Sequence, residues 1–171
     1  MPERRPSFKH LSFRFEDVLR GSMIYAAGDT AAALLAGEFS VLRLLGILLI
    51  GGTVYAFEIP NYFNWIDRRV QASGGFQSAL QRALLAMAYF NPLWIARHIL
   101  FIKLFQGEWA QIGWGLLATG LASFLVNIPI SLLANLIIQN KIPLRWRFVA
   151  SAVFSALMAV YYALSAIWFR F

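Results

Sequence analysis

Six side chains that could carry charge or hydrogen bonds lie inside otherwise apolar stretches of the sequence. They are Asp29, Glu58, Arg97, His98, Asn127 and Asn135. If these stretches cross a lipid bilayer, a charged group at a helix centre costs ~2.5–3.5 kcal/mol, so such groups face the bundle interior, a partner or water. Two interpretations stay open. The six residues could line a hydrated pathway and set its selectivity, or Asp29 and Arg97 could form a neutralised pair that fixes helix register.

The depth of each charge along its helix distinguishes between partners. Counted from the basic side at ~1.5 Å per residue, Asp29 lies ~15 Å deep, Arg97 ~22 Å and Glu58 ~10 Å. The long side chain of Arg97 can reach across the difference in depth between Arg97 and Asp29, so we expect Arg97 to pair with Asp29 before Glu58. Glu58 is then expected to meet water or a backbone donor near Pro60.

The signatures of enzymes and of metal sites are missing from the sequence. There is no Gly-rich phosphate loop, no GxSxG elbow and no HExxH pair. The chain has no cysteine, and its two histidines, His10 and His98, make no metal-ligand pattern. The prediction is therefore a non-enzymatic protein with no catalytic residues, no cofactor and no metal.

The composition indicates a protein of the membrane. Of its 171 residues 60% are hydrophobic and 13% are charged, whereas soluble domains have about 45–50% and about 25%. Too few charges remain for a hydrated shell. The net charge of +7 would suit a nucleic acid, but the basic residues form no stripe and sit between apolar segments. The expected partner is the lipid bilayer, and no nucleic acid is expected.

These residues must be positioned by helices long enough to cross ~30 Å of hydrocarbon, which takes ~20 mostly apolar residues. We predict an all-α, polytopic transmembrane helical bundle with a single domain over residues 19–171. Its five candidate spans are 19–37, 41–65, 79–105, 109–138 and 145–169. The fourth is too long for a simple span, so Pro129 is expected to kink or divide it.

The first 18 residues are expected to form a basic N-terminal tail at the membrane interface. They lack the apolar core and the cleavage site of a secretory signal. The tail contains a short amphipathic stretch that would lie at the membrane surface, made by Phe8, Leu11, Phe13 and Phe15. A mobile tail is the alternative.

The charges between the spans predict the orientation. With five spans, the tail and the connections 66–82 and 139–147 fall on one side, and together with Arg20 they hold eleven of the fifteen basic residues. Because basic residues stay on the cytoplasmic side, this asymmetry places the N-terminus on the cytoplasm-like side.

Small residues at intervals of four predict how the helices pack. In membranes, small faces let helix backbones approach closely. One such run lies in the first span and one in the last, namely Gly28, Ala32 and Ala36, and Ser151, Ser155, Ala159 and Ala163.

Four segments in this order resemble the Mpv-seventeen / peroxisomal membrane protein family. The first three are GDTAAALL in the first span, YFNWIDRR at 62–69 and ALLAMAYFNPLWI in the third span. The fourth is NIPISLLANLIIQNKIPLRWRF, which is similar to that family's segment Trp-Pro-x-x-Gln-x-x-Asn-Phe followed by Val-Pro-x-x-x-Arg. The family-motif positions of structural character are Gly28, Asp67, Pro92, Pro129, Pro143 and Arg147. Departures such as Ile128 for the Trp and Leu132 for the Gln indicate a distant, for example bacterial, member.

The resemblance implies a small integral membrane protein without catalytic residues. Members lie in the mitochondrial inner membrane, peroxisomes and related membranes, so the implied location is a bacterial inner membrane or an organellar membrane of that type. Some members resemble weakly selective channels. The first functional hypothesis is thus a weakly selective channel or permeability modulator for small solutes, either alone or as a homo-oligomer. The rival is a non-catalytic accessory or scaffolding subunit of a larger membrane complex, docked through its small faces.

Overall fold

The computed structural model describes residues 11–71 and 74–168 of the chain, with side chains through residue 161. The predicted all-α architecture is confirmed, since every regular element within these residues is helical. In chain order the elements are α1 (Phe15–Ala36), α2 (Val41–Ile50), the π-helical turn η1 (Gly51–Tyr55), α3 (Ala56–Arg69), α4 (Gly75–Tyr89), α5 (Pro92–Gln106), the 3-10 turn η2 (Trp109–Gln111), α6 (Gly115–Lys141) and α7 (Leu144–Trp168).

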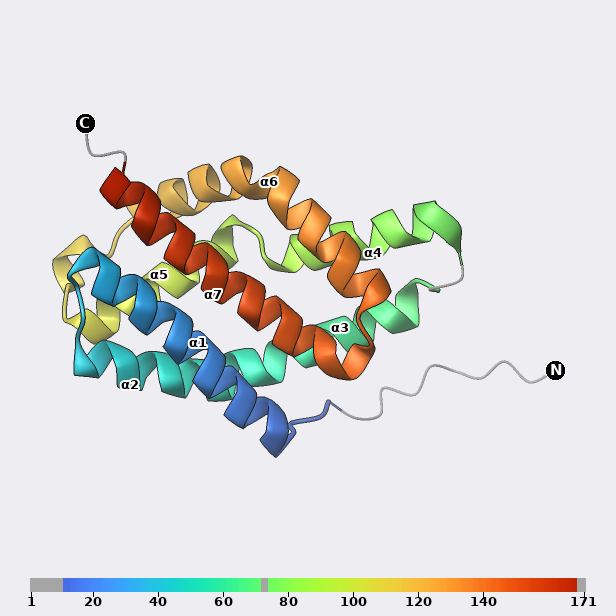
Figure 1. Ribbon diagram of the computed structural model, residues 1–171, viewed down its shortest axis with the longest axis horizontal. Coiled ribbons are helices and arrows are strands. Elements are labelled where there is room, and N and C mark those ends of the chain that lie inside the picture. The colour runs from blue at the N-terminus through green and yellow to red at the C-terminus, as the bar shows by residue number, and fades with distance from the viewer. Residues whose placement is uncertain (1–10, 72–73, 169–171) are drawn as a thin grey trace.

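The helices form five roughly antiparallel rods (Figure 1). α1, α6 and α7 each make one rod. α2, η1 and α3 follow one another without a break and make another, and α4 and α5 make the fifth. The end of α3, the start of α4 and the α6–α7 connection lie toward one end of the molecule, called here the basic end, while α1 begins nearer the middle of the long axis (Figure 1). The described parts of two predicted basic connections, 66–82 and 139–147, therefore share that end.

Four stretches of the described residues are long and apolar enough to cross a membrane. They are Val41–Arg69, Gly75–Gln106, Gly115–Lys141 and Leu144–Tyr161. The sequence predicts five spans, but only four stretches of the described residues meet these criteria. The predicted span that does not meet them is the first, which is α1. Its small residues, together with the charges of Arg20 and Asp29, keep its hydropathy low.

Two prolines act differently from what the sequence predicts. The span predicted at 79–105 is not one helix, because the chain breaks at Phe90 and Asn91 and Pro92 starts a new helix. The Asn91 side chain caps α5 by accepting a hydrogen bond from the Trp94 backbone N–H, 3.1 Å away, and proline suits the first helical turn. α6 continues through Pro129 as a single helix, so of the predicted kink or division the division is wrong, and the helix is bent along its length (Figure 1).

Close helix contacts follow the small residues, as predicted. α1 and α7 make the most extensive contact in the fold. A Cβ added to Gly28 would lie 2.3 Å from the Cβ of Ala156, so only glycine permits this approach. α1 also crosses the second rod where Gly21 meets Gly51, since a Cβ on Gly21 would lie 2.2 Å from the Gly51 carbonyl oxygen. These contacts hold α1 between α7 and the second rod.

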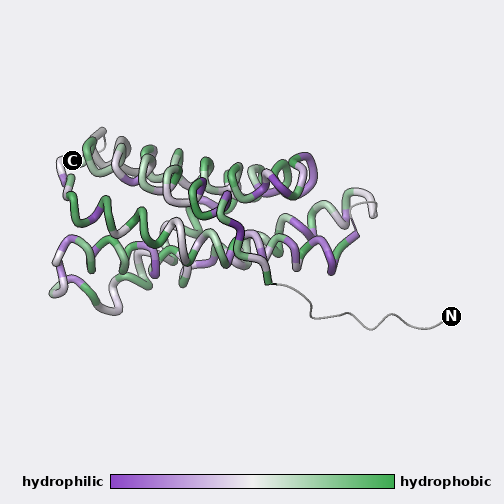
Figure 2. The backbone as a smooth tube through the Cα atoms, turned by 90° about the horizontal axis from the view of Figure 1, so that it is seen from below, coloured by the Kyte–Doolittle hydropathy of each residue, from purple (hydrophilic) through white to green (hydrophobic). Residues whose placement is uncertain are grey.

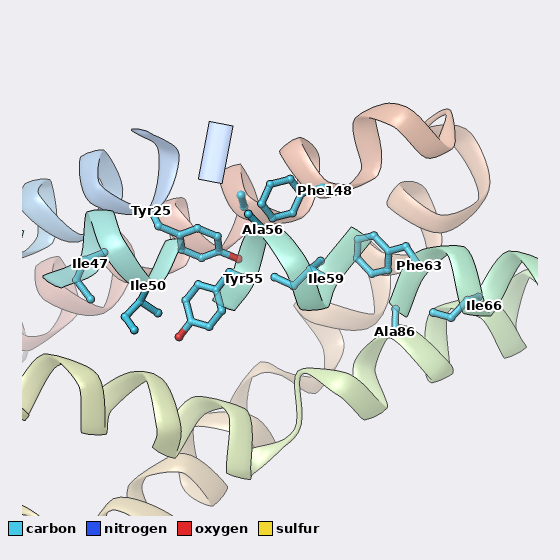
Figure 3. Close-up of a cluster of buried hydrophobic side chains, with 11 residues drawn as sticks. Tyr25, Ile47, Ile50, Tyr55, Ala56, Ile59, Phe63, Ile66, Ala86 and Phe148 are labelled. Carbon is cyan, nitrogen blue, oxygen red and sulfur yellow. The ribbon is translucent and has the colours of Figure 1, made fainter. Parts of the chain in front are cut away.

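The buried apolar core is built around the second rod. Ile47, Tyr55, Ile59 and Ile66 are fully buried along one side of it (Figure 3). Tyr25 of α1 lies beside Tyr55, with ring centroids 4.8 Å apart (Figure 3). The core therefore fixes α1 against the second rod at the level of the π-helical turn.

The outer surface of the bundle is also apolar. The helices are mostly hydrophobic along their lengths, and hydrophilic residues gather chiefly toward their ends (Figure 2). On α6 alone, Leu125, Val126 and Leu133 are exposed. An apolar exterior of this kind is typical of a surface in contact with lipid rather than water.

Candidate functional site

A cavity of about 500 Å³ lies between α1, α5, α6 and α7. This volume falls in the range of roughly 300–1,000 Å³ that ligand pockets occupy. Toward one end the cavity reaches Glu38, whose side chain is 59% exposed, and toward the basic end it reaches Asn135 and Ser151. Much of its wall is apolar, including Ile95 and Ile99 of α5.

One wall of the cavity carries a ladder of polar side chains from α6. Its members are Ser123, Asn127, Ser131 and Asn135, and all four line the cavity. Residues four apart share a helix face, and at ~1.5 Å per residue this polar ladder extends over ~18 Å. Ser151 and Ser155 of α7 add two further hydroxyls. The polar ladder gives an otherwise apolar helix a hydrogen-bonding face.

The amide groups of the polar ladder are oriented by their own helix. Asn127 Nδ2 donates to the Ser123 carbonyl oxygen at 2.7 Å, and Asn135 Nδ2 donates to the Ser131 carbonyl oxygen at 2.9 Å. A carbonyl oxygen only accepts, so the amide nitrogen must be the atom that faces it. Both Oδ1 atoms are left as acceptors, and Asn135 Oδ1 is buried without a hydrogen-bond partner.

Asp29 faces the cavity, and its cation is Arg43. Arg43 Nε and Nη2 donate to the two carboxylate oxygens of Asp29, each at 2.8 Å, and both side chains are under 10% exposed. The sequence-based pairing of Asp29 with Arg97 is therefore wrong. The hairpin of α1 and α2 brings Arg43 next to Asp29, and a bidentate guanidinium neutralises the carboxylate fully. Glu38 lies 3.6 Å from Arg43 at the exposed edge.

His98 lies in the cavity wall among aromatic residues. Its Nδ1 is 2.9 Å from the Tyr55 hydroxyl, and its ring stacks on Trp94 with 5.7 Å between centroids. The indole nitrogen of Trp94, also in the wall, is buried without a hydrogen-bond partner. His98 is thus held in a fixed orientation, and the Trp94 indole N–H is an unpaired donor buried in the wall.

Glu58 and Arg97 form a second charge cluster that does not line the cavity. Arg97 Nη1 and Nη2 donate to the Glu58 carboxylate at 3.0 and 2.7 Å, and the Tyr89 hydroxyl donates to the same group. Both charged side chains are about one-third exposed. Glu58, which was expected to meet water or a backbone donor, therefore has Arg97 and Tyr89 as its hydrogen-bond partners. The break before α5 redirects Arg97 toward α3, which counting along one straight helix does not reveal.

A third cluster closes the basic end. Asp67 accepts hydrogen bonds from both Arg82 and Arg147. Arg82, 1% exposed, also donates to the carbonyl oxygens of Val70 and Gln139. The Gln139 side chain is fully buried, and both its amide atoms lack a hydrogen-bond partner. It stands four residues after Asn135, so it continues the spacing of the polar ladder toward this basic-end cluster.

The structure places the family-motif positions chiefly at helix contacts. Asp67 and Arg147 bond to each other at 2.6 Å, Gly28 lies between α1 and α7, and Pro143 lies in the connection between α6 and α7. Pro129 is exposed and does not line the cavity.

The start of the described chain is tied to α3. The Ser12 backbone N–H donates to Asn61 Oδ1, and Asn61 Nδ2 donates to the Ser12 carbonyl oxygen, both at 2.9 Å. Leu11 and Phe13 are exposed, and Phe8 of the predicted amphipathic stretch lies outside the described residues. Burial raises the pKa of the nearby Asp17 carboxyl, although Arg14 and Arg20 act to lower it. α1 begins at Phe15, four residues before the predicted tail boundary.

Of the six predicted interior residues, the cavity contains Asp29, His98, Asn127 and Asn135. Sequence reasoning missed Arg43 as the partner of Asp29, and it missed the serines of the polar ladder. The signal for the serines was the four-residue spacing from Ser123 to Asn135 in an apolar helix. In the described part of the chain, no group of three or more His, Cys, Asp or Glu side chains could hold a metal ion. No protein-family model, no curated protein and no solved structure matches the chain.

Proposed function

We propose that this chain is an integral membrane protein whose cavity provides a route for small solutes, as a weakly selective channel or permeability modulator. The observation that carries the proposal is a cavity of about 500 Å³, with a polar ladder and a neutralised ion pair in its wall, inside a bundle with an apolar exterior. Hydrogen-bonding groups inside an apolar bundle are costly unless they meet one another, water or a solute.

The membrane setting is supported by four helices of sufficient length and apolarity and by large apolar side chains on the outside. The gathering of basic connections at one end supports an N-terminus on the cytoplasm-like side. The resemblance to the Mpv-seventeen family points the same way and supplies the expectation of a bacterial inner or organellar membrane.

In the proposal, the end of the cavity at Glu38 is the entrance and the basic end is the gate. The cavity extends to the exposed Glu38 at the far end, while Gln139 and the Asp67–Arg82–Arg147 cluster fill the basic end. In the proposal, solute enters the cavity at the far end, and passage requires the basic-end cluster to open. Such gating movements are typical of routes that alternate between states.

The experiment is solute flux through purified protein in liposomes and planar bilayers. Ser131→Phe places a ring in the cavity and is expected to reduce flux strongly, whereas Leu133→Phe places the same ring on the exposed face of the same helix and is expected to leave flux unchanged. If wild type and Asp29→Asn pass neither ions nor neutral solutes at any voltage or pH, the proposal is wrong. Equal flux through the two Phe variants would also contradict it.

The rival role as an accessory subunit loses one of its supports. That role was to use the small faces around Gly28 and Ser155 for docking, but Gly28 packs against Ala156 of α7 and Ser155 lines the cavity. Purification in mild detergent separates the two functions, because a stoichiometric foreign partner would favour the subunit.

A further inference from the structure

We propose that the solutes admitted by the cavity are small, uncharged molecules with several hydroxyl or amide groups, of the polyol or urea type. This proposal rests on the proposed function, because it names the solute class of the same cavity. It is carried by the groups that the walls leave unused once their internal hydrogen bonds have been assigned.

The charges of the inner cavity are already neutralised. Asp29 and Arg43 satisfy each other through two hydrogen bonds of 2.8 Å. His98 Nδ1 is engaged by the Tyr55 hydroxyl. An ion that left water for this space would lose its hydration without gaining a free counter-charge deep in the cavity, which is strongly unfavourable. Glu38 is the other acid in the wall, and it lies at the exposed mouth.

The free groups are neutral donors and acceptors. Asn135 Oδ1 is a buried acceptor and Trp94 Nε1 a buried donor, and neither has a partner. Hydroxyls of Ser123 and Ser131 lie on the same helix face as Asn135 and can donate or accept. A solute with alternating hydroxyl or amide groups can replace its lost water contacts at the serine hydroxyls, while Asn135 Oδ1 and Trp94 Nε1 have almost no exposed surface and are reached only when those side chains turn.

The wall beside the polar ladder is apolar, and this matches the shape of a polyol. Ile95, Ile99 and Ile102 of α5 line the same cavity. A polyol presents hydroxyls along one edge and C–H groups along another, so it can satisfy the polar ladder and the isoleucines together. An inorganic ion has no apolar edge and gains nothing from that part of the wall.

The test compares solute classes in liposomes that contain the purified protein. Light scattering after osmotic shock reports glycerol and urea entry, and planar bilayers report potassium chloride conductance. The expected result is accelerated entry of glycerol and urea with little conductance. Asn135→Leu keeps a similar volume but removes the free acceptor, and it should slow glycerol entry about fivefold, the effect of one lost hydrogen bond. Ile137→Leu, on the exposed face, should leave the rate unchanged.

The outcomes separate this proposal from the function on which it rests. Ion conductance that matches or exceeds neutral-solute entry would overturn the solute class while leaving a channel function in place. Silence toward every solute would remove the channel function itself. Ser123→Ala is the gentler second variant if Asn135→Leu fails to fold, and an unchanged glycerol rate in a folded Ser123→Ala, Ser131→Ala double variant would also overturn the proposal.

Discussion

Removal of Arg43 provides the most direct test of how this bundle tolerates its buried acid. Arg43→Met leaves the Asp29 carboxylate, whose side chain is 6% exposed, without its two charge-assisted hydrogen bonds of 2.8 Å. Such bonds contribute about 1.5–3 kcal/mol each, and loss of one partner of a buried pair costs about 3–5 kcal/mol. We therefore expect Arg43→Met to lower the free energy of unfolding by about 3–5 kcal/mol, the cost of removing one partner from a buried ion pair.

The double variant Asp29→Leu, Arg43→Met separates the pair from its surroundings. With both charges gone no carboxylate is stranded, so its stability should return close to that of wild type. Reversible unfolding by SDS in mixed micelles, followed by circular dichroism, gives the coupling energy. Asp29→Leu combined with Arg97→Met is the control, and its effects should add to within about 0.5 kcal/mol because the two residues do not pair. Additivity between Asp29 and Arg43, or coupling between Asp29 and Arg97, would refute the assignment.

Three further predictions concern helix packing and the other charge clusters. Gly28→Leu forces α1 away from α7, so it should lower the melting temperature and reduce the free energy of unfolding by at least about 1–3 kcal/mol. Gly115→Ala is the control, because open space surrounds that Cα, and its melting temperature should change little. Arg82→Gln removes a fully buried cation that donates four hydrogen bonds, and it should lower the free energy of unfolding by about 3–5 kcal/mol. Arg68→Gln changes an exposed residue, so in the same SDS unfolding assay its free energy of unfolding should stay within about 0.5 kcal/mol of wild type. Glu58→Gln breaks an ion pair that is about one-third exposed, so it should lower the free energy of unfolding by about 1 kcal/mol or less. A loss as large as that of Arg82→Gln would contradict the distinction between the exposed and the buried charge cluster.

The sequence was sufficient for the helices and for the end of the molecule that collects the basic residues. Apolar length predicts helices, and charge distribution predicts which connections lie together. The small residues around Gly28 also predicted a close contact, because a four-residue repeat of Gly and Ala has one obvious structural use. The partner helix is α7, but the residue that Gly28 meets is Ala156, whereas Ser151, Ser155 and Ala159 of the predicted α7 run line the cavity.

The pairing of charges could not be deduced in the same way. The depth estimate for Arg97 assumed one straight helix from Arg82, but the chain breaks before Pro92, and the count no longer measures position. The depth estimate also ignored which helices are joined by a short connection. Asp29 and Arg43 lie on helices joined by residues 37–40, so the short hairpin between α1 and α2 makes them neighbours. Depth alone gives a ranking of partners, while topology decides which of them can touch.

The cavity itself follows from uneven packing, which a single sequence does not display. α7 packs along α1 through small residues, and its contact with α6 is much less extensive. α6 therefore keeps a face that no neighbouring helix fills, and that face is the one bearing Ser123, Asn127, Ser131 and Asn135. A four-residue polar repeat would normally indicate a tight interhelical contact sealed by hydrogen bonds. Here the repeat faces about 500 Å³ of space, and the amide oxygen of Asn135 has no hydrogen-bond partner, so groups that could have joined two helices line a cavity instead.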